Sequence, residues 1–160
     1  MGMFHIVLLE PEIPQNAGNV VRTAAATGSV LHLVEPLGFS LDEKHLKRAG
    51  LDYWDKVRIL VHESTDDFFS SIQGGRLFFF SSKGHHAYHE VSYQDGDYLI
   101  FGKESVGIDE TLVREHEESV LRIPMLPGIR CLNLSNAVAL VVYEALRQGG
   151  FEGFQEEGKL

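Results

Sequence analysis

The sequence predicts an α/β fold in which a mostly parallel sheet carries helices on both faces. Short apolar runs alternate with longer helix-forming segments along the chain, an arrangement typical of parallel strands joined by helical crossovers. The chain has 160 residues, of which 44% are hydrophobic and 23% are charged, which fits one globular domain over residues 1–160. The same composition excludes a disordered, a collagen-like or a disulfide-stapled chain.

Apolar runs bounded by turn residues predict the strands of this sheet. We expect them at residues 3–9, 30–34, 57–61, 76–82, 98–102 and 120–125. Pro11 and Pro14 follow the first run and require a loop there, because proline cannot donate a backbone hydrogen bond. Asn16 is then a natural N-cap for the first helix, and Gly28 ends that helix.

Helical segments lie between these runs and after the last one. We expect them at residues 17–27, 41–49, 66–73, 109–117 and from 133 or 134 to 148. Ala17 and the alanines at 24–26 suit close packing of the first helix, Asp109 caps the fourth, and Gly149 ends the fifth. Residues 81–97 are polar and rich in histidine, so we expect a long loop that is functional or mobile.

The last helix is apolar around nearly its whole circumference. Its apolar residues are Leu134, Ala137, Val138, Ala139, Leu140, Val141, Val142, Ala145 and Leu146. Such a helix must be covered on more than one face. The pattern indicates a subunit interface, so we expect a homodimer, although a central helix in a monomeric α/β layer would also account for it.

Charge and cysteine content narrow the functional classes. There are 14 Lys and Arg against 23 Asp and Glu, a net charge of −9, and residues 59–160 hold 16 of the acidic residues. This balance gives no long-range attraction to nucleic acid, so RNA binding needs a local basic patch. Cys131 is the only cysteine, which excludes an internal disulfide and favours a reducing, cytoplasmic setting. Residues 1–14 lack the segments of a signal peptide or membrane span.

Several familiar motifs are incomplete. Residues 102–107 have the glycine spacing of a phosphate loop, but Ile108 and Asp109 stand where Lys and Ser or Thr are needed. Two glycines that shape a strand-to-helix turn are the simpler alternative. The histidines of residues 85–89 lack the glutamate of a zinc helix, so we expect no metal. No histidine is fixed near Cys131, which argues against covalent catalysis.

Polar residues gather at two further turns between strands and helices. Residues 16–22 would place backbone N–H groups and the Arg22 guanidinium beside one loop, which suits an anion, although an ordinary cap with an exposed arginine is the other interpretation. Residues 130–136 make a similar amide-rich start to the last helix, where simple capping is also possible. Together with residues 102–107, these turns would converge on one crevice at the carboxyl edge of the sheet.

Three segments, in this order, resemble the motifs of the SpoU branch of the SPOUT RNA methyltransferases. They are residues 16–22, 99–107 and 123–138. Residues 48–53 and 91–98 further resemble the TrmL type, the tRNA wobble-nucleotide 2′-O-methyltransferases. The similarity extends from about residue 4 to residue 148 and so covers nearly the whole chain.

The resemblance implies a C-terminal trefoil knot, a homodimer and S-adenosylmethionine as cofactor. Backbone groups of three loops would hold the cofactor, at Phe80, at Gly102 and at Ile123 with Cys131. Relatives often carry serine where Cys131 stands, and a thiol is a poor hydrogen-bond donor. The implied reaction is 2′-O-methylation of the wobble cytidine or modified uridine of tRNA, with leucine tRNAs as the expected substrates. Methylation of another tRNA or rRNA nucleotide is the alternative.

Methyl transfer to a ribose oxygen requires positioning and removal of a proton. The expected catalytic residues are Arg22, Asn16, Glu104 and Asn136. Because a guanidinium stays protonated in proteins, we assign Arg22 to the adjacent phosphate and leave the general base open. Glu104 would face the sulfonium or hold loop amides, and Asn136 would orient the ribose. The expected tRNA-binding residues form a basic rim of Lys44, Lys47, Arg48, Lys83 and Arg130.

Two rival classes fit less well. A Rossmann-type oxidoreductase needs Gly-x-Gly-x-x-Gly after the first strand, where residues 9–14 read Leu-Glu-Pro-Glu-Ile-Pro. A non-catalytic RNA-binding module could share the cofactor motifs without turnover. A methyl-transfer assay separates that module from an enzyme.

Overall fold

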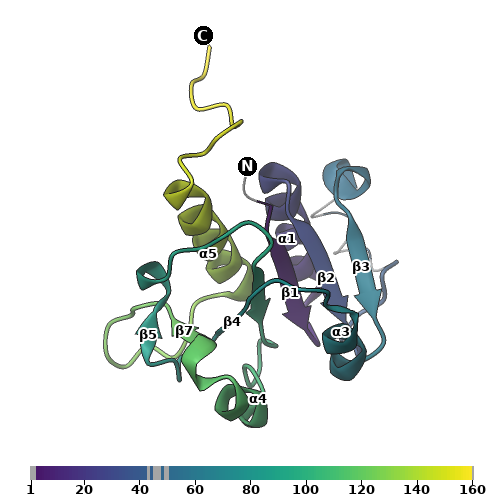
Figure 1. Ribbon diagram of the computed structural model, residues 1–160. Coiled ribbons are helices and arrows are strands. Elements are labelled where there is room, and N and C mark those ends of the chain that lie inside the picture. Colours follow the sequence, from purple (N-terminus) through teal and green to yellow (C-terminus); the bar gives the residue numbers. More distant parts are fainter. Residues whose placement is uncertain (1–2, 43, 45–47, 49–50, 160) are drawn as a thin grey trace.

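Among the described residues, seven strands form one sheet (Figure 1). The computed structural model describes residues 3–42, 44, 48 and 51–159. The strands are β1 (His5–Leu9), β2 (Val30–Val34), β3 (Ile59–His62), β4 (Leu77–Phe80), β5 (His86–Ala87), β6 (Tyr98–Phe101) and β7 (Val120–Arg122). Their order is β3-β2-β1-β6-β4-β7-β5, and every neighbouring pair is parallel. The predicted α/β fold with a parallel sheet is confirmed.

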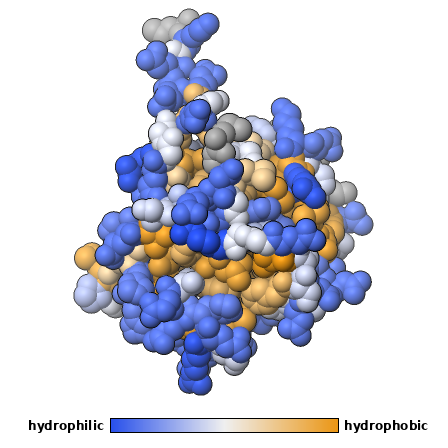
Figure 2. Space-filling view, viewed as in Figure 1, coloured by the Kyte–Doolittle hydropathy of each residue, from blue (hydrophilic) through white to orange (hydrophobic). Residues whose placement is uncertain are grey.

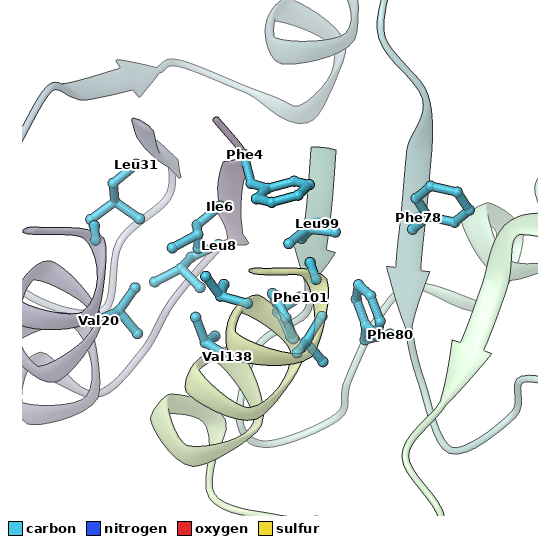
Figure 3. Close-up of a cluster of buried hydrophobic side chains, with 14 of the residues drawn as sticks. Phe4, Ile6, Leu8, Val20, Leu31, Phe78, Phe80, Leu99, Phe101 and Val138 are labelled. Carbon is cyan, nitrogen blue, oxygen red and sulfur yellow. The ribbon is translucent and has the colours of Figure 1, made fainter. Parts of the chain in front are cut away.

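Helices cover both faces of this sheet. They are α1 (Pro14–Thr27), α3 (Thr65–Ser71), α4 (Glu110–Glu115) and α5 (Leu134–Gln148), with the 3₁₀ turns η1 (Leu51–Lys56), η2 (Tyr88–Glu90) and η3 (Glu117–Ser119). Successive side chains of a strand point to opposite faces. Ile6 and Leu8 of β1 therefore pack with Val20 of α1 and Val138 of α5 on one face (Figure 3).

The opposite face of β1 packs against the shorter helices. Val7 and Leu9 belong to a second buried cluster that includes Phe68 of α3 and Val113 of α4. Both faces of the central strands are thus covered, which explains why these strands are continuous apolar runs rather than alternating ones.

The first helix begins earlier than its sequence predicts. Its N-cap is Ile13, whose side chain makes no capping hydrogen bond, and Pro14 occupies the first turn. Proline is favourable there because its missing N–H would have no partner inside the helix. The prediction that Asn16 caps the helix is wrong. Asn16 lies within the first turn and is only 6% exposed, so its side chain makes contacts elsewhere.

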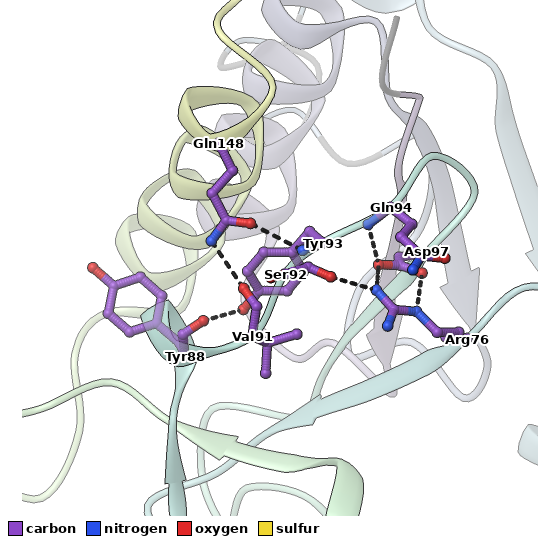
Figure 4. Close-up of polar contacts among 8 residues, drawn as sticks. All are labelled: Arg76, Tyr88, Val91, Ser92, Tyr93, Gln94, Asp97 and Gln148. Carbon is purple, nitrogen blue, oxygen red and sulfur yellow. Dashed lines mark hydrogen bonds and ion pairs between the residues drawn. The ribbon is translucent and has the colours of Figure 1, made fainter.

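The segment predicted as a long loop contains β5 and η2 and is bound to the sheet and to α5 (Figure 4). Arg76 donates two hydrogen bonds to the Asp97 carboxylate, at 3.0 and 2.8 Å, and one to the Ser92 carbonyl at 2.7 Å. Gln148 of α5 accepts a hydrogen bond from the backbone N–H of Tyr93 at 2.9 Å. The expected long loop is thus interrupted by two short elements, and contacts of its backbone and of the Asp97 side chain fix it to the sheet and to α5.

Two other regions differ from expectation. Residues 51–56, to which the sequence assigned no element, form the 3₁₀ turn η1. The helix expected at residues 41–49 falls largely outside the described residues, although Lys44 and Arg48 are helical and exposed.

The helix α5 has a covered side and an exposed side. Val138, Val141 and Val142 are fully buried, whereas Leu140 and Tyr143 are 36% and 42% exposed. Apolar surface of α5 therefore faces solvent in the single chain. Just beyond α5, Phe151 and Phe154 pack against the main core, and the residues that follow extend away from the body as a mainly hydrophilic segment (Figures 1 and 2).

Candidate active site

A cavity of about 610 Å³ lies at the carboxyl ends of the strands, within the size range of small-molecule sites. The segments that follow β1, β4, β6 and β7 all contribute to it, as the predicted crevice requires. It is lined by Ile13, Asn16, Phe80, Ser81, Ser82, Lys83, Phe101, Gly102, Lys103, Glu104, Ser105, Val106, Gly107, Ile108, Ile123, Met125, Arg130, Cys131, Leu132, Asn133, Leu134 and Ala137. The three groups of polar turns singled out in the sequence thus meet at one site.

The loop after β6 turns sharply at Gly102. A Cβ atom at this position would lie 2.4 Å from the backbone nitrogen of Ile108, so only glycine fits. Across the turn, Gly107 donates its N–H to the Lys103 carbonyl at 2.9 Å, and Gly107 has a φ of +73°. The interpretation of these glycines as turn-forming residues is confirmed, and the same loop lines the cavity.

The Glu104 carboxylate binds the N-terminus of α1. Its oxygens accept hydrogen bonds from the backbone N–H groups of Glu12 at 2.9 Å and Ile13 at 3.2 Å, and from the Asn16 side chain at 3.5 Å. The first turn of a helix has unpaired N–H groups and partial positive charge, and both favour a carboxylate. We predicted that Glu104 would either face the sulfonium or hold loop amides. In this structure its carboxylate binds backbone amides.

The Glu12 carboxylate, in turn, binds the loop that carries Glu104. Nothing in the sequence indicates this contact. The Glu12 carboxylate accepts a hydrogen bond from the Ser105 N–H at 2.9 Å and one from the Ser105 hydroxyl at 3.0 Å. The hydrogen bond from the Ser105 backbone, followed by that from its hydroxyl, lowers the pKa of the Glu12 carboxyl. Beside it, Lys103 pairs with Glu10 at 3.8 Å.

Asn133 joins the starts of α5 and α1. Its side-chain oxygen accepts from the N–H groups of Ser135 at 3.0 Å and Asn136 at 3.3 Å, which confirms it as the N-cap of α5. Its amide donates to the Asn16 side chain at 3.1 Å. No local pattern in the sequence indicates this last contact.

The structure brings together most of the predicted site residues and separates others. Those that line the cavity are Asn16, Glu104, Phe80, Gly102, Ile123, Cys131, Lys83 and Arg130. Arg22, Asn136, Lys44 and Arg48 are exposed and do not belong to its lining. Lys47 lies outside the described residues.

The guanidinium of Arg22 is held on the surface by an aromatic ring. It lies 5.1 Å from the centre of the Tyr53 ring, a separation typical of a cation–π contact. Tyr53 belongs to η1, which packs beside α1. Tyr53 thus gives the exposed Arg22 side chain one aromatic contact on the surface.

Exposed apolar side chains surround the same region. Val106 in the loop after β6 is 74% exposed, and Leu126 and Ile129 in the segment after β7 are 79% and 56% exposed. Exposed apolar side chains near a cavity are found at many binding sites.

The cavity suits an organic cofactor rather than a metal ion. Phe80, Phe101 and Ile108 give it apolar walls, while the turns around it supply backbone N–H and C=O groups. This combination fits an adenosyl group with a charged tail. Among residues 3–42, 44, 48 and 51–159, no group of three or more His, Cys, Asp and Glu side chains could hold a metal. Nor does any helix in that part of the chain have the length and apolarity to cross a bilayer.

The fold and the cavity define a class of enzyme once the chain is compared with known proteins. The model of the SpoU rRNA Methylase family matches residues 3–143. The chain therefore belongs to the SpoU rRNA methylase family.

Individual relatives indicate which reaction members of this family catalyse. The chain is 53% identical over 152 residues to a tRNA (cytidine(34)-2′-O)-methyltransferase of Saccharophagus degradans, covering 94% of this chain and 99% of that protein. A solved structure described as "Structural insights into the 2-OH methylation of C/U34 on tRNA" has a TM-score of 0.90 and 48% identity, covering 94% and 99%. The AdoMet-bound rRNA methyltransferase of Sinorhizobium meliloti has a TM-score of 0.82 and 25% identity, covering 91% of this chain and 56% of that one.

Proposed function

We propose that this chain transfers a methyl group from S-adenosylmethionine to the ribose 2′-oxygen of the wobble cytidine or uridine, nucleotide 34, of tRNA. The observation that carries the proposal is the cavity at the strand ends, lined by the same three motifs that resemble the SpoU enzymes. The choice of nucleotide is supported by 53% identity to a tRNA (cytidine(34)-2′-O)-methyltransferase over nearly the full length of both chains.

Phe80, Gly102, Ile123 and Cys131 are the proposed cofactor-binding residues. All four line the cavity: Phe80 is the last residue of β4, Gly102 follows β6, Ile123 follows β7, and Cys131 precedes α5. When bound there, S-adenosylmethionine supplies a methyl group on a positively charged sulfur. We assign Cys131 a backbone contact to the cofactor, for which the absence of a serine hydroxyl has little consequence. A side-chain contact at this position would be weakened, because a thiol is a poor hydrogen-bond donor.

Arg22 and Asn136 are the proposed contacts to RNA at the reaction centre. Arg22 carries a permanent charge, and its planar guanidinium matches a phosphate bidentately, so we assign it to the phosphate beside the acceptor ribose. Asn136 is exposed in the first turn of α5, where its amide can orient ribose hydroxyls. Glu104 is assigned a positioning role, because both of its oxygens already accept hydrogen bonds from the start of α1.

The proposed tRNA-binding rim is a local group of basic residues on a chain whose net charge is negative. Lys83 and Arg130 line the cavity, and Lys44 and Arg48 are exposed on the chain that follows β2. Phosphate contacts by such residues supply RNA affinity even on a chain with a net charge of −9.

We further propose a homodimer that acts on leucine tRNAs in the cytoplasm. The exposed apolar residues Leu126, Ile129 and Leu140 support association of two copies, because solvated surface of this kind is costly in a monomer. The single cysteine suits a reducing compartment. The leucine tRNA substrate follows from the resemblance to the wobble-nucleotide enzymes.

The test is nucleoside mass spectrometry on cellular tRNA from a strain that lacks this activity, incubated with the protein and isotopically labelled S-adenosylmethionine. Label in 2′-O-methylcytidine or 2′-O-methyluridine at position 34 is the expected result. Label at another nucleotide would overturn the substrate assignment while keeping the reaction. Absence of label, with cofactor binding measured separately, would identify a binding module.

A further inference from the structure

Glu12 does not line the cavity, yet its side chain holds the loop that does. Its carboxylate accepts the N–H and the hydroxyl of Ser105 at 2.9 and 3.0 Å, and Ser105 is a lining residue. We propose that Glu12 is a positioning residue that fixes residues 103–107 for cofactor binding. The proposal rests on the proposed function only in taking S-adenosylmethionine as the occupant of the cavity.

The contact is reciprocal. Glu104, on the loop after β6, accepts from the backbone N–H of Glu12, while Glu12 accepts from the residue that follows Glu104. We call this arrangement of Glu12, Glu104 and Ser105 the Glu12/Glu104 clasp. Each carboxylate therefore accepts hydrogen bonds from the segment that carries the other.

The loop after β6 needs such contacts because burial does little to fix it. Ser105, Val106 and Gly107 are all exposed, with Val106 at 74%. The conformation of an exposed loop is set by its hydrogen bonds and backbone preferences rather than by packing. The hydrogen bonds to Glu12 therefore act at the point of the loop where packing is weakest.

The residues around Glu12 are themselves firmly placed. Glu10 donates its N–H to the Val34 carbonyl at 2.9 Å, and Gly38 donates to the Pro11 carbonyl at 2.9 Å. A Cβ on Gly38 would lie 2.6 Å from the Glu12 carbonyl oxygen, so the two backbones are in close contact. The segment that carries Glu12 follows β1 and is therefore held by contacts with β2 and with Gly38 in the segment after β2. These contacts give Ser105 a fixed partner.

The charge of the Glu12 carboxylate strengthens its hydrogen bonds with Ser105. The Ser105 hydrogen bonds, with a smaller effect of Lys103, lower the pKa of Glu12, so its carboxylate stays charged further into the acidic range than an isolated glutamate. A charged acceptor makes the stronger hydrogen bond. Glu104 is compensated separately by the start of α1.

The experiment compares Glu12→Ala and Glu12→Gln with Glu63→Ala as the control. Glu63 is exposed and precedes α3, away from the cavity lining. Binding of S-adenosylhomocysteine is measured by calorimetry, the melting temperature of each ligand-free variant is recorded, and KM for S-adenosylmethionine and for tRNA is determined separately.

We expect Glu12→Ala to bind S-adenosylhomocysteine about 10- to 100-fold more weakly and to raise KM for S-adenosylmethionine, with KM for tRNA unchanged. Glutamine can accept from the Ser105 N–H and donate to the Ser105 hydroxyl, so Glu12→Gln should stay within about threefold of the original affinity.

Two results would overturn the proposal. One is a folded Glu12→Ala protein whose affinity for S-adenosylhomocysteine equals that of Glu63→Ala. The other is equal loss in the alanine and glutamine variants together with a lowered melting temperature, which would mean that Glu12 serves stability alone. Because ligand binding is measured without tRNA, neither result depends on which nucleotide is methylated.

Discussion

Asn133 and Asn16 connect two helices whose starts lie far apart in the sequence: the Asn133 amide donates to the Asn16 side-chain oxygen at 3.1 Å across 117 positions. Asn16 also donates to Glu104, so the starts of α1 and α5 and the loop after β6 share one set of hydrogen bonds. All three residues line the cavity. The shape of the site therefore depends on polar contacts as well as on the apolar core.

This relationship predicts coupling between the two asparagines. Asn133→Ala removes the cap of α5 and should lower the free energy of unfolding by about 1–2 kcal/mol. Asn16→Ala should cost less, and a double-mutant cycle in urea should give a coupling energy of about 0.5–1 kcal/mol. The control is Asn19→Ala, on the exposed side of α1. Strict additivity of the two alanine substitutions would contradict the contact.

Arg22→Ala should abolish turnover and leave the cofactor site intact. Arg22 does not line the cavity, and its guanidinium lies over Tyr53, so its removal should subtract the proposed phosphate contact and leave the cavity lining unchanged. We expect kcat to fall by at least about 100-fold, with unchanged binding of S-adenosylhomocysteine. Arg114→Ala, on α4, is the control. Loss of cofactor binding in Arg22→Ala would refute the assignment.

Binding of tRNA should weaken steeply as salt rises. A protein that neutralises phosphates releases counterions, so the logarithm of affinity falls linearly with that of salt concentration. Lys83→Ala and Arg130→Ala should each reduce this slope by about 1, because each would remove one proposed phosphate contact beside the cavity. Filter binding from about 50 to 300 mM KCl measures the slope. A tRNA affinity that does not change with salt concentration in the unsubstituted protein would contradict tRNA binding by the basic rim.

Three histidines on adjacent strands predict loss of stability in acid. His5 Nδ1 lies 2.9 Å from His32 Nε2, and His32 Nδ1 lies 2.9 Å from His62 Nε2. Burial, and then the neighbouring His5, His62 and Arg58, lower the pKa of His32 to about 3. Because the unfolded chain takes up this proton near pH 6.5, stability is fully present above that pH. It falls by up to about 1.4 kcal/mol per pH unit down to about 3.

Urea unfolding at pH 7.5, 6.0 and 5.0 tests this effect. In His32→Leu the decrease between pH 7.5 and 5.0 should be smaller than in the original protein, since one buried proton acceptor is gone. Carboxylates titrate in both proteins and cancel in the comparison. Parallel curves for the two proteins would show that His32 does not control acid stability.

Arg76→Ala should be strongly destabilising, because it leaves the Asp97 carboxylate buried with its main partner removed. Asp97 is 1% exposed, and Arg76 makes two hydrogen bonds to it. We expect a loss of about 2–4 kcal/mol in the free energy of unfolding. Arg114 pairs with Glu110 on the surface at 3.0 Å, and Arg114→Ala should cost less than about 0.5 kcal/mol. Similar losses for the two variants would contradict the importance of burial.

Most strands and helices were predictable from local patterns. The apolar run before Glu10 became β1, and Asp109 caps α4 as expected. Asn133 caps α5, which decides a start that the sequence left open. Errors arose where local preference competes with tertiary contact. Asn16 has a strong capping preference, but Pro14 suits the first turn better, and the Asn16 side chain is used by Glu104 and Asn133.

The candidate site shows the same division. Motif order pointed to the three loops that line the cavity. Phe80, Gly102, Ile123 and Cys131 belong to its lining, and their role in cofactor binding stays a prediction. Glu12 was overlooked because nothing in its neighbourhood of the sequence points to Ser105, which lies 93 positions away. The roles of Arg22 and Asn136 stay predictions, since both are exposed and do not belong to the cavity lining.

By itself, the sequence determined the fold class, the family and the loops of the site. Apolar periodicity and motif spacing are local properties, and strands that run parallel must bring their carboxyl ends to one edge. Only the tertiary structure decided how the loops hold one another. The Glu12/Glu104 clasp and the Asn16–Asn133 contact join residues that are 92 and 117 positions apart. Such pairings depend on the final placement of each backbone, which no local preference encodes.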